Sequence, residues 1–272
     1  MTSSVTGSAP IVLDVTDTAP VPFWRLVNVE FRKAYDTRAG FWLLFSIAVI
    51  TLIAEVIALI VGISQDLNDF SLGTFTAVAA VVTSFLLPVL AIMLVSTEWT
   101  QRSAMVTFSL ESRRSRVMLA KLVVGFLLSL ASVIFAIVVG LVCNAIFAAA
   151  GGTTEWWNSD VRDGVVGFVL SQNLSMLVGF AFAALFLNTA AAVVIFFAYS
   201  FVLPTLFEIG ASLIDWFADL RPWIDFAQAQ NQLFEISTMS GKEWAQLIIS
   251  AAIWLGIPFV IGLRRILRAE VK

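Results

Sequence analysis

The side chains with the most chemical potential lie in one polar, basic stretch, residues 96–121, between two strongly apolar segments. Glu98 stands near its beginning, and five basic residues follow: Arg102, Arg113, Arg114, Arg116 and Lys121. Glu98 should lie near the C-terminal end of a helix, where the helix dipole disfavours an anion. Arg102 is four residues further on and is a ready partner. We therefore expect Glu98 to form a salt bridge, with Arg102 as its local partner.

Two interpretations of this stretch remain open. Met105, Phe108 and Leu110 alternate with small polar residues, a pattern that favours a short amphipathic helix. Such a helix, with the arginines beside it, would present an apolar and cationic surface to a cytosolic protein. Alternatively, the arginines only hold this stretch on the cytoplasmic side of a membrane.

The sequence excludes several kinds of catalytic site. It has no histidine and a single cysteine, Cys143, inside an apolar run, so the usual zinc or haem ligand sets and catalytic triads cannot be assembled. The nearest match to a phosphate-binding loop, residues 240–243, ends in Glu243 where Ser or Thr should bind magnesium. We expect no catalytic residue, no metal site and no cofactor bound by this chain.

Four polar residues interrupt otherwise apolar segments: Glu55, Asn144, Gln172 and Asn173. Each is about six to eight residues from the outer end of its segment, which at about 1.5 Å per residue places all four roughly 10 Å below the outer surface. An ionisable side chain at that depth must face protein or water, so Glu55 should point into the assembly. The four residues could line a substrate path or hydrogen-bond one another between helices, and both interpretations remain open.

Composition identifies the class of protein that must position these residues. Of 272 residues, 60% are hydrophobic and only 13% are charged, and the mean hydropathy is +0.94, more than a soluble core could bury. Six segments are long and apolar enough to span a bilayer as helices: residues 41–63, 75–95, 122–150, 164–187, 190–209 and 244–263. Little more than Asn188-Thr189 separates the fourth and fifth spans, which should form an antiparallel hairpin. Gly179 and Ala183 form a small-residue pair expected at a helix–helix contact.

Outside the spans and the polar stretch, the sequence predicts four segments of different character: a flexible tail (residues 1–22), an amphipathic interface helix (23–40), short helices on or in the outer leaflet (210–243) and a basic tail (264–272). In the interface helix Trp24, Val27, Phe31 and Tyr35 recur every three or four residues.

The distribution of basic residues predicts the orientation. Four Lys and Arg residues precede the first span, five follow the second span and four lie at the C-terminus, so thirteen of the sixteen fall in segments that share one side. The positive-inside rule therefore predicts that both termini are cytoplasmic.

Two segments carry a resemblance to a known family. Glu98-Trp99-Thr100-Gln101-Arg102, followed by Thr107-Phe108 and the run from Ser112 to Lys121, resembles the loop between spans two and three of bacterial ABC-2 type permeases. The segment from Glu30 to Arg38 is similar to the E-x-x-K-x-x-x-x-R opening of the same family. The layout of spans and loops is also similar over essentially the whole chain.

The resemblance implies an all-α membrane protein of the type V ABC exporter class in a bacterial plasma membrane. Such a subunit would pair with a second permease copy, or a paralogous permease, and with two separate ATP-binding subunits that hold the ATP and magnesium. Its substrate would be an amphiphilic molecule such as a drug, an antimicrobial peptide or a lipid, and its partners would include membrane lipids and no nucleic acid. The alternative is a non-transporting immunity or scaffold protein that only binds a partner.

By residue-level carry-over, the interface helix and the polar stretch would contact the ATPase and transmit its closure. The residues expected at this coupling interface are Glu30, Arg32, Lys33, Glu98, Arg102, Met105, Phe108, Leu110, Arg113, Arg114 and Arg116.

Overall fold

The computed structural model describes residues 21–65, 67, 70–103, 105, 107, 113–152 and 158–268. All regular elements in these residues are helices, and six helical segments are long and apolar enough to cross a membrane. They are α2 (Arg38–Ser64), α3 (Leu72–Thr100), α5 (Arg114–Ala149), α6 (Ser159–Phe186), the segment Thr189–Leu213 and the segment Gly241–Arg268. The predicted all-α fold with six spanning helices is confirmed, and the chain is a multi-pass membrane protein.

The last two of these segments are each divided by a π-helical turn. The first comprises α7 (Thr189–Phe197), η1 (Ala198–Val202) and α8 (Leu203–Leu213), and the second comprises α11 (Gly241–Ala251), η3 (Ala252–Gly256) and α12 (Ile257–Arg268). Each turn is followed at once by a proline-bearing helix start, at Pro204 and at Pro258. Proline cannot donate a backbone hydrogen bond and its ring crowds the carbonyl four residues before it, so the wider π turn accommodates the ring without ending the span.

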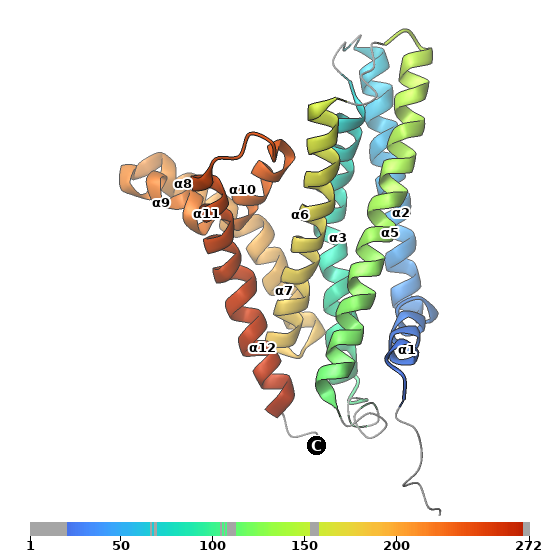
Figure 1. Ribbon diagram of the computed structural model, residues 1–272, viewed down its shortest axis with the longest axis vertical. Coiled ribbons are helices and arrows are strands. Elements are labelled where there is room, and N and C mark those ends of the chain that lie inside the picture. Colours follow the sequence, from blue (N-terminus) through green and yellow to red (C-terminus); the bar gives the residue numbers. More distant parts are fainter. Residues whose placement is uncertain are drawn as a thin grey trace, which may run out of the picture.

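Every spanning helix is longer than predicted, and each begins before its predicted first residue, although α5 and α6 end one residue before their predicted last residue. The longest, α5, has 36 residues, or about 54 Å at helical rise, and rises with α2 above the end of α6 (Figure 1). α3 runs on to Thr100 and α5 begins at Arg114, so both helices enter the stretch predicted as a connecting loop. Only residues 101–113 separate the two helices.

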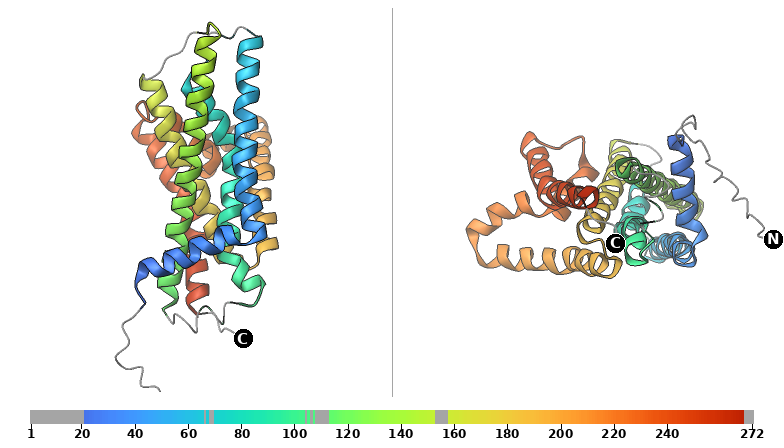
Figure 2. Two further views of the ribbon diagram at one scale, coloured as in Figure 1. Left: turned by 90° about the vertical axis from the view of Figure 1, so that its right-hand side faces the viewer. Right: turned by 90° about the horizontal axis from the view of Figure 1, so that it is seen from below.

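Helices α3 and α6 form the centre of the bundle. Within their most apolar windows, 56% of α3 and 61% of α6 is buried, against 11% of the segment Thr189–Leu213. Figure 2 shows the two central helices between α2 and α5 on one side and α7 and α12 on the other. A Cβ atom on Gly179 of α6 would lie 2.4 Å from the carbonyl oxygen of Pro88 in α3, and Ala183 one turn on is fully buried. The predicted small-residue contact is confirmed.

The predicted hairpin between the fourth and fifth spans is also confirmed. α6 ends at Phe186, and Leu187 caps it with a left-handed φ of 53°. The side chain of Asn188 then caps α7 by accepting from the Ala191 N–H at 3.0 Å. The next residue ties the hairpin to the core, because the Oγ1 of Thr189 lies 2.8 Å from Ser96 Oγ and 3.0 Å from Thr100 Oγ1 in α3.

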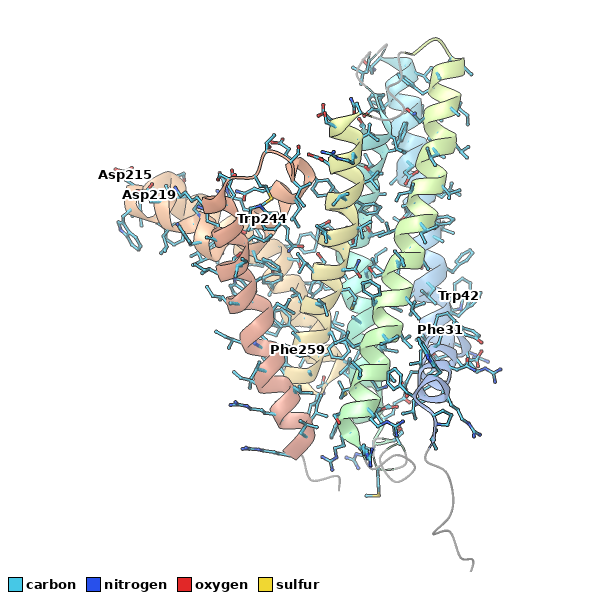
Figure 3. The ribbon with its side chains drawn as sticks, in the orientation of Figure 1. Phe31, Trp42, Asp215, Asp219, Trp244 and Phe259 are labelled. Atoms are coloured by element: carbon cyan, nitrogen blue, oxygen red, sulfur yellow. The ribbon has the colours of Figure 1, made fainter. Side chains whose placement is uncertain are left out.

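The N-terminal helix α1 (Phe23–Asp36) crosses the base of the bundle (Figure 2, left). It buries Val27, Glu30 and Ala34 at helical spacing, whereas Phe31, like Trp42 of α2, lies on the side away from the centre of the bundle (Figure 3). The predicted apolar stripe is therefore divided, because Val27 packs against the bundle whereas the aromatic side chains are exposed. Exposed aromatic side chains are typical of a helix in a membrane interface.

Short helices fill the connection before the last span, where the sequence predicts them. They are α9 (Asp215–Ile224), α10 (Phe226–Asn231) and the 3-10 turn η2 (Gln232–Glu235). α8 and α9 form an arm that carries Asp215 and Asp219 at its tip, and α10 returns towards α6 (Figures 1 and 3). Asp163 of α6 holds the returning chain by accepting from the Ser237 N–H at 2.9 Å.

Candidate functional site

Four charged side chains from three helices form a closed ring beside α1. Lys33 Nζ lies 2.7 Å from Glu30 Oε1 and 2.7 Å from Glu98 Oε1, so it bridges α1 to α3. Lys121 Nζ of α5 lies 2.6 Å from Glu30 Oε2 and 3.3 Å from Glu98 Oε1. Each lysine thus contacts both carboxylates, and the ring, defined as Glu30, Lys33, Glu98 and Lys121, carries no net charge.

The ring is largely shielded from solvent and has further hydrogen bonds. The Lys121 side chain is only 2% exposed and also donates to the Leu94 carbonyl oxygen at 3.0 Å. Glu98 Oε1 accepts from the Thr107 hydroxyl at 3.1 Å, which attaches the segment between α3 and α5 to the ring. Buried charges are stable only when they are paired and hydrogen-bonded, and this arrangement meets both conditions.

Lys33 is the most exposed member of the ring and feels both carboxylates. Burial alone would lower the pKa of Lys33, but the neighbouring Glu30 and Glu98 carboxylates outweigh burial and raise this pKa above the usual lysine value. Lys33 is therefore a cation at neutral pH and keeps its proton to a higher pH than an ordinary lysine.

A cavity of about 560 Å³ adjoins the ring. Its walls come from α1, the start of α2, α3, α5 and the start of α7, and they include all four ring residues. Polar groups of the α3 end, among them Thr97 and Gln101, face the same space, as do Leu90 and Met93. A cavity of this size with charged and apolar walls can accept a side chain or short segment of a partner, or a small amphiphile.

The predicted pairing of Glu98 with Arg102 is wrong. Among the described residues, Glu98 forms its ion pairs with Lys33 and Lys121. α3 ends at Thr100, and Arg102 has a left-handed φ of 57° and is exposed. The geometry that places residues four apart on one helical face is therefore lost before Arg102.

The other predicted coupling residues have different surroundings. Arg114 donates to the Ile266 carbonyl at 2.9 Å and Arg116 to the Val21 carbonyl at 2.8 Å, so both tie the start of α5 to other parts of the chain. The remaining described ones, Arg32, Met105 and Arg113, are exposed. Phe108 and Leu110 lie outside the described residues, as do residues 1–20 of the predicted N-terminal tail.

Sequence reasoning missed Lys121 as a member of the ring. The sequence analysis counts Lys121 among the basic residues that set topology and includes it in the Ser112–Lys121 run, but it does not predict Lys121 at the coupling interface, although this lysine stands immediately before a strongly apolar run. That position was the available signal, because a lysine at the edge of an apolar helix is either exposed at the membrane surface or paired inside the protein. Lys121 is buried in α5, so it is paired inside the protein.

The four polar residues in the spans fall into different environments. Glu55 of α2 faces α5, because its Oε2 lies 3.6 Å from the position a Cβ would take on Gly140, and Asn144 lies one turn beyond Gly140. Gln172 of α6 instead donates to the Ala80 carbonyl of α3 at 3.1 Å, and Asn173 donates to the Val169 carbonyl of its own helix at 2.7 Å. The structure thus brings Glu55 to the Asn144 face of α5 and turns Gln172 towards α3.

Gln172 lines a second, smaller cavity of about 200 Å³. Aromatic side chains Phe85 and Tyr199 line it together with Ser84, and Gln230 of α10 closes one side through a hydrogen bond from the Ser175 hydroxyl at 3.2 Å. The lining mixes apolar rings with amide and hydroxyl groups, which suits an amphiphilic molecule.

Comparison with known proteins adds no identification, because no protein-family model matches the chain and no curated protein matches it.

Proposed function

We propose that this chain is the permease subunit of an ATP-driven exporter that moves an amphiphilic molecule, with ATP hydrolysed by a separate subunit. The observation that carries the proposal is the charge ring, because it joins α1 to two spanning helices at the end of the bundle where the ATPase is expected. The resemblance of the segments around Glu30 and Glu98 to ABC-2 type permeases supports it, since ring members lie in both segments.

In this proposal the ring converts movement of the ATPase into movement of helices. Pressure on α1 or on the segment between α3 and α5 would act on Lys33, Glu98 and Thr107, which are bonded together. Separating a buried pair such as Glu30 and Lys121 leaves uncompensated charge and costs about 3–5 kcal/mol, so the three helix ends would move as a unit. The cavity beside the ring would receive a contact element of the ATPase.

The cavity at Gln172 is the proposed place where substrate is first held. Its volume of about 200 Å³ is below the roughly 300–1,000 Å³ of sites for drug-sized ligands. A drug, peptide or lipid would therefore require movement of the surrounding helices, and α10 is the shortest α-helix that lines the cavity. A second permease copy would enlarge the enclosed space further.

The test is reconstitution with an ATP-binding subunit encoded next to this chain. We expect the two proteins to co-purify and to hydrolyse ATP in nanodiscs, and we expect Glu98→Gln to lower substrate-stimulated hydrolysis while the protein stays folded. The matched control is Glu208→Gln, since Glu208 is ion-paired with Arg221 on the arm and is 69% exposed.

Equal stimulated hydrolysis in the Glu98→Gln and Glu208→Gln complexes would exclude coupling through the ring. Failure of any neighbouring ATP-binding subunit to bind would instead favour the non-transporting membrane protein that only binds a partner.

A further inference from the structure

Glu55 is a fully buried carboxyl group to which the described residues offer no hydrogen-bond partner. Its side chain has 0% exposure, and neither carboxylate oxygen has a hydrogen-bond partner among the described residues. It lies where three spanning helices meet, because the space a Cβ would occupy on Gly140 of α5 is bordered by Leu72 and Phe75 of α3 and by Glu55 of α2. Glu55 is nine residues from the end of α2 that is remote from the charge ring.

Two further polar side chains on the same helix faces are also unsatisfied. Thr51 lies one turn before Glu55 on the buried face of α2, and its hydroxyl has no partner among the described residues. Asn144 lies one turn beyond Gly140 on α5, is 0% exposed, and leaves both Oδ1 and Nδ2 without a partner in the same part of the chain. Three buried polar side chains on adjoining helix faces thus have unused hydrogen-bonding capacity.

Among the residues that the structure describes, no cationic side chain interacts with Glu55 to stabilise its carboxylate form. A buried apolar cluster of Leu59, Phe75, Cys143 and Phe147 surrounds this junction. The Cys143 thiol is the one titratable group that the described residues place in electrostatic contact with Glu55, and no described lysine or arginine interacts with it. From α3 the contacts are Leu72 and Phe75, both apolar.

We propose that Glu55, Thr51 and Asn144 form a proton-binding site inside the membrane domain. A carboxylate buried at this depth is costly unless a cation or water stabilises it, and no described lysine or arginine interacts with Glu55. A bound proton removes the charge. The proton also gives Glu55 an O–H donor for Asn144 Oδ1 or the Thr51 hydroxyl, and this bond requires a side-chain rotation because the three groups form no hydrogen bond as placed. The second Glu55 oxygen can then accept from Asn144 Nδ2, so one proton satisfies several groups at once.

This site does not depend on the proposed transport function. It makes the contact of α2 with α5 sensitive to protons, because water reaches the carboxyl only when the two helices separate, and hydrated Glu55 can ionise. Alkaline conditions should therefore favour separation of α2 from α5 around Gly140.

The test uses the full chain in nanodiscs and dicyclohexylcarbodiimide, an apolar reagent that adds to protonated carboxyl groups. We expect one adduct on the peptide that contains Glu55 at neutral pH, a falling yield as the pH rises, and no adduct on this peptide in Glu55→Gln. A water-soluble carbodiimide should show the reverse preference, modifying the exposed Glu208 and sparing Glu55.

Infrared difference spectra of wild type minus Glu55→Gln provide a measurement that does not require reagent access. A carboxylic acid carbonyl band at neutral pH that shifts in heavy water is expected. A carboxylate band in its place, at neutral pH, would overturn the proposal. Protection of Glu55 from the apolar reagent by added sodium ions at constant pH would also overturn it, because the site would then take a metal cation.

Discussion

Two polar clusters in the same bundle neutralise buried carboxylates in opposite ways. At the ring, Glu30 and Glu98 share two lysines at distances of 2.6 to 3.3 Å, and the charges cancel within the protein. Where α2, α3 and α5 meet, Glu55 is more deeply buried than Glu30 and Glu98, and no lysine or arginine in the described part of the chain interacts with it. Burial of a carboxyl group alone therefore does not determine whether the group is ionised. The neighbouring side chains determine whether the carboxylate keeps its charge and joins helices through salt bridges, or loses its charge by binding a proton.

The largest predicted effect comes from breaking the ring at Lys121. Lys121→Met leaves two carboxylates with one lysine in a shielded site, and we expect the free energy of unfolding to fall by about 3–5 kcal/mol. Thermal unfolding in nanodiscs measures the effect. Lys242→Met is the control, because Lys242 is an exposed residue at the start of α11 and should change the midpoint little.

Charge balance can be separated from loss of packing at the same place. The double variant Glu30→Gln with Lys121→Met removes one charge of each sign, and it should be more stable than Lys121→Met alone because fewer charges are left uncompensated. A double variant less stable than the single one would contradict the closed ring.

The same substitution at the two clusters gives the next largest contrast. Glu30→Gln removes a charge that two lysines contact and should cost about 1.5–3 kcal/mol, the usual value of hydrogen bonds to charged groups. Glu55→Gln replaces a neutral acid by a neutral amide of equal size and should change stability by under about 0.5 kcal/mol. The melting temperatures of both variants, measured in the same kind of nanodisc, test this difference. An equal decrease in melting temperature in both variants would mean that Glu55 is ionised.

A smaller effect is expected where Gly140 adjoins Glu55. A Cβ at this position would lie 3.2 Å from Phe75 Cβ and 3.3 Å from Leu72 Cδ1, so Gly140→Ala should push α3 away from α5 and cost about 1 kcal/mol. It should also let the apolar carbodiimide react faster with Glu55. Gly241→Ala is the matched control, because a Cβ there meets no atom within 4 Å. Unchanged stability and labelling in Gly140→Ala would show that the junction is looser than described.

The sequence predicts what depends on composition and on local spacing. The six spans follow from apolar runs, and the Gly179 contact follows from residue size at helical spacing. The ring could only partly be predicted, because Lys33 and Glu98 are 65 positions apart and Lys121 and Glu30 are 91 apart. Only the packing of helices determines which of these charges meet.

The errors have equally specific causes. Arg102 is predicted as the partner of Glu98 on the assumption that the helix continues, but α3 ends before it. The depth of Glu55 and Gln172 follows from counting residues, whereas the direction in which each side chain points depends on helix rotation, which the sequence does not specify. Glu55 consequently faces α5 and Gln172 bonds to α3.

The smallest predicted effect concerns pH, and it separates the two clusters without destroying either. The pKa of Lys33 is raised in the folded protein, so the stability it contributes is fully present below the unfolded lysine value of about 10.4 and is lost only as the pH rises through the higher folded value. Between neutral pH and about pH 8, Lys33 should therefore contribute a constant amount to stability.

We expect Glu55 to be the main source of any loss of stability in this interval, because its ionisation is favoured only where water reaches the carboxyl in the opened or unfolded chain. The thiol of Cys143 ionises in the unfolded chain only at about pH 8.5, above this interval. We expect the alkaline decrease in melting temperature to persist in Lys33→Met and to be reduced in Glu55→Gln. If Lys33→Met removed the pH dependence and Glu55→Gln kept it, the proton would have to be assigned to the ring, and the contrast between the two clusters would be reversed.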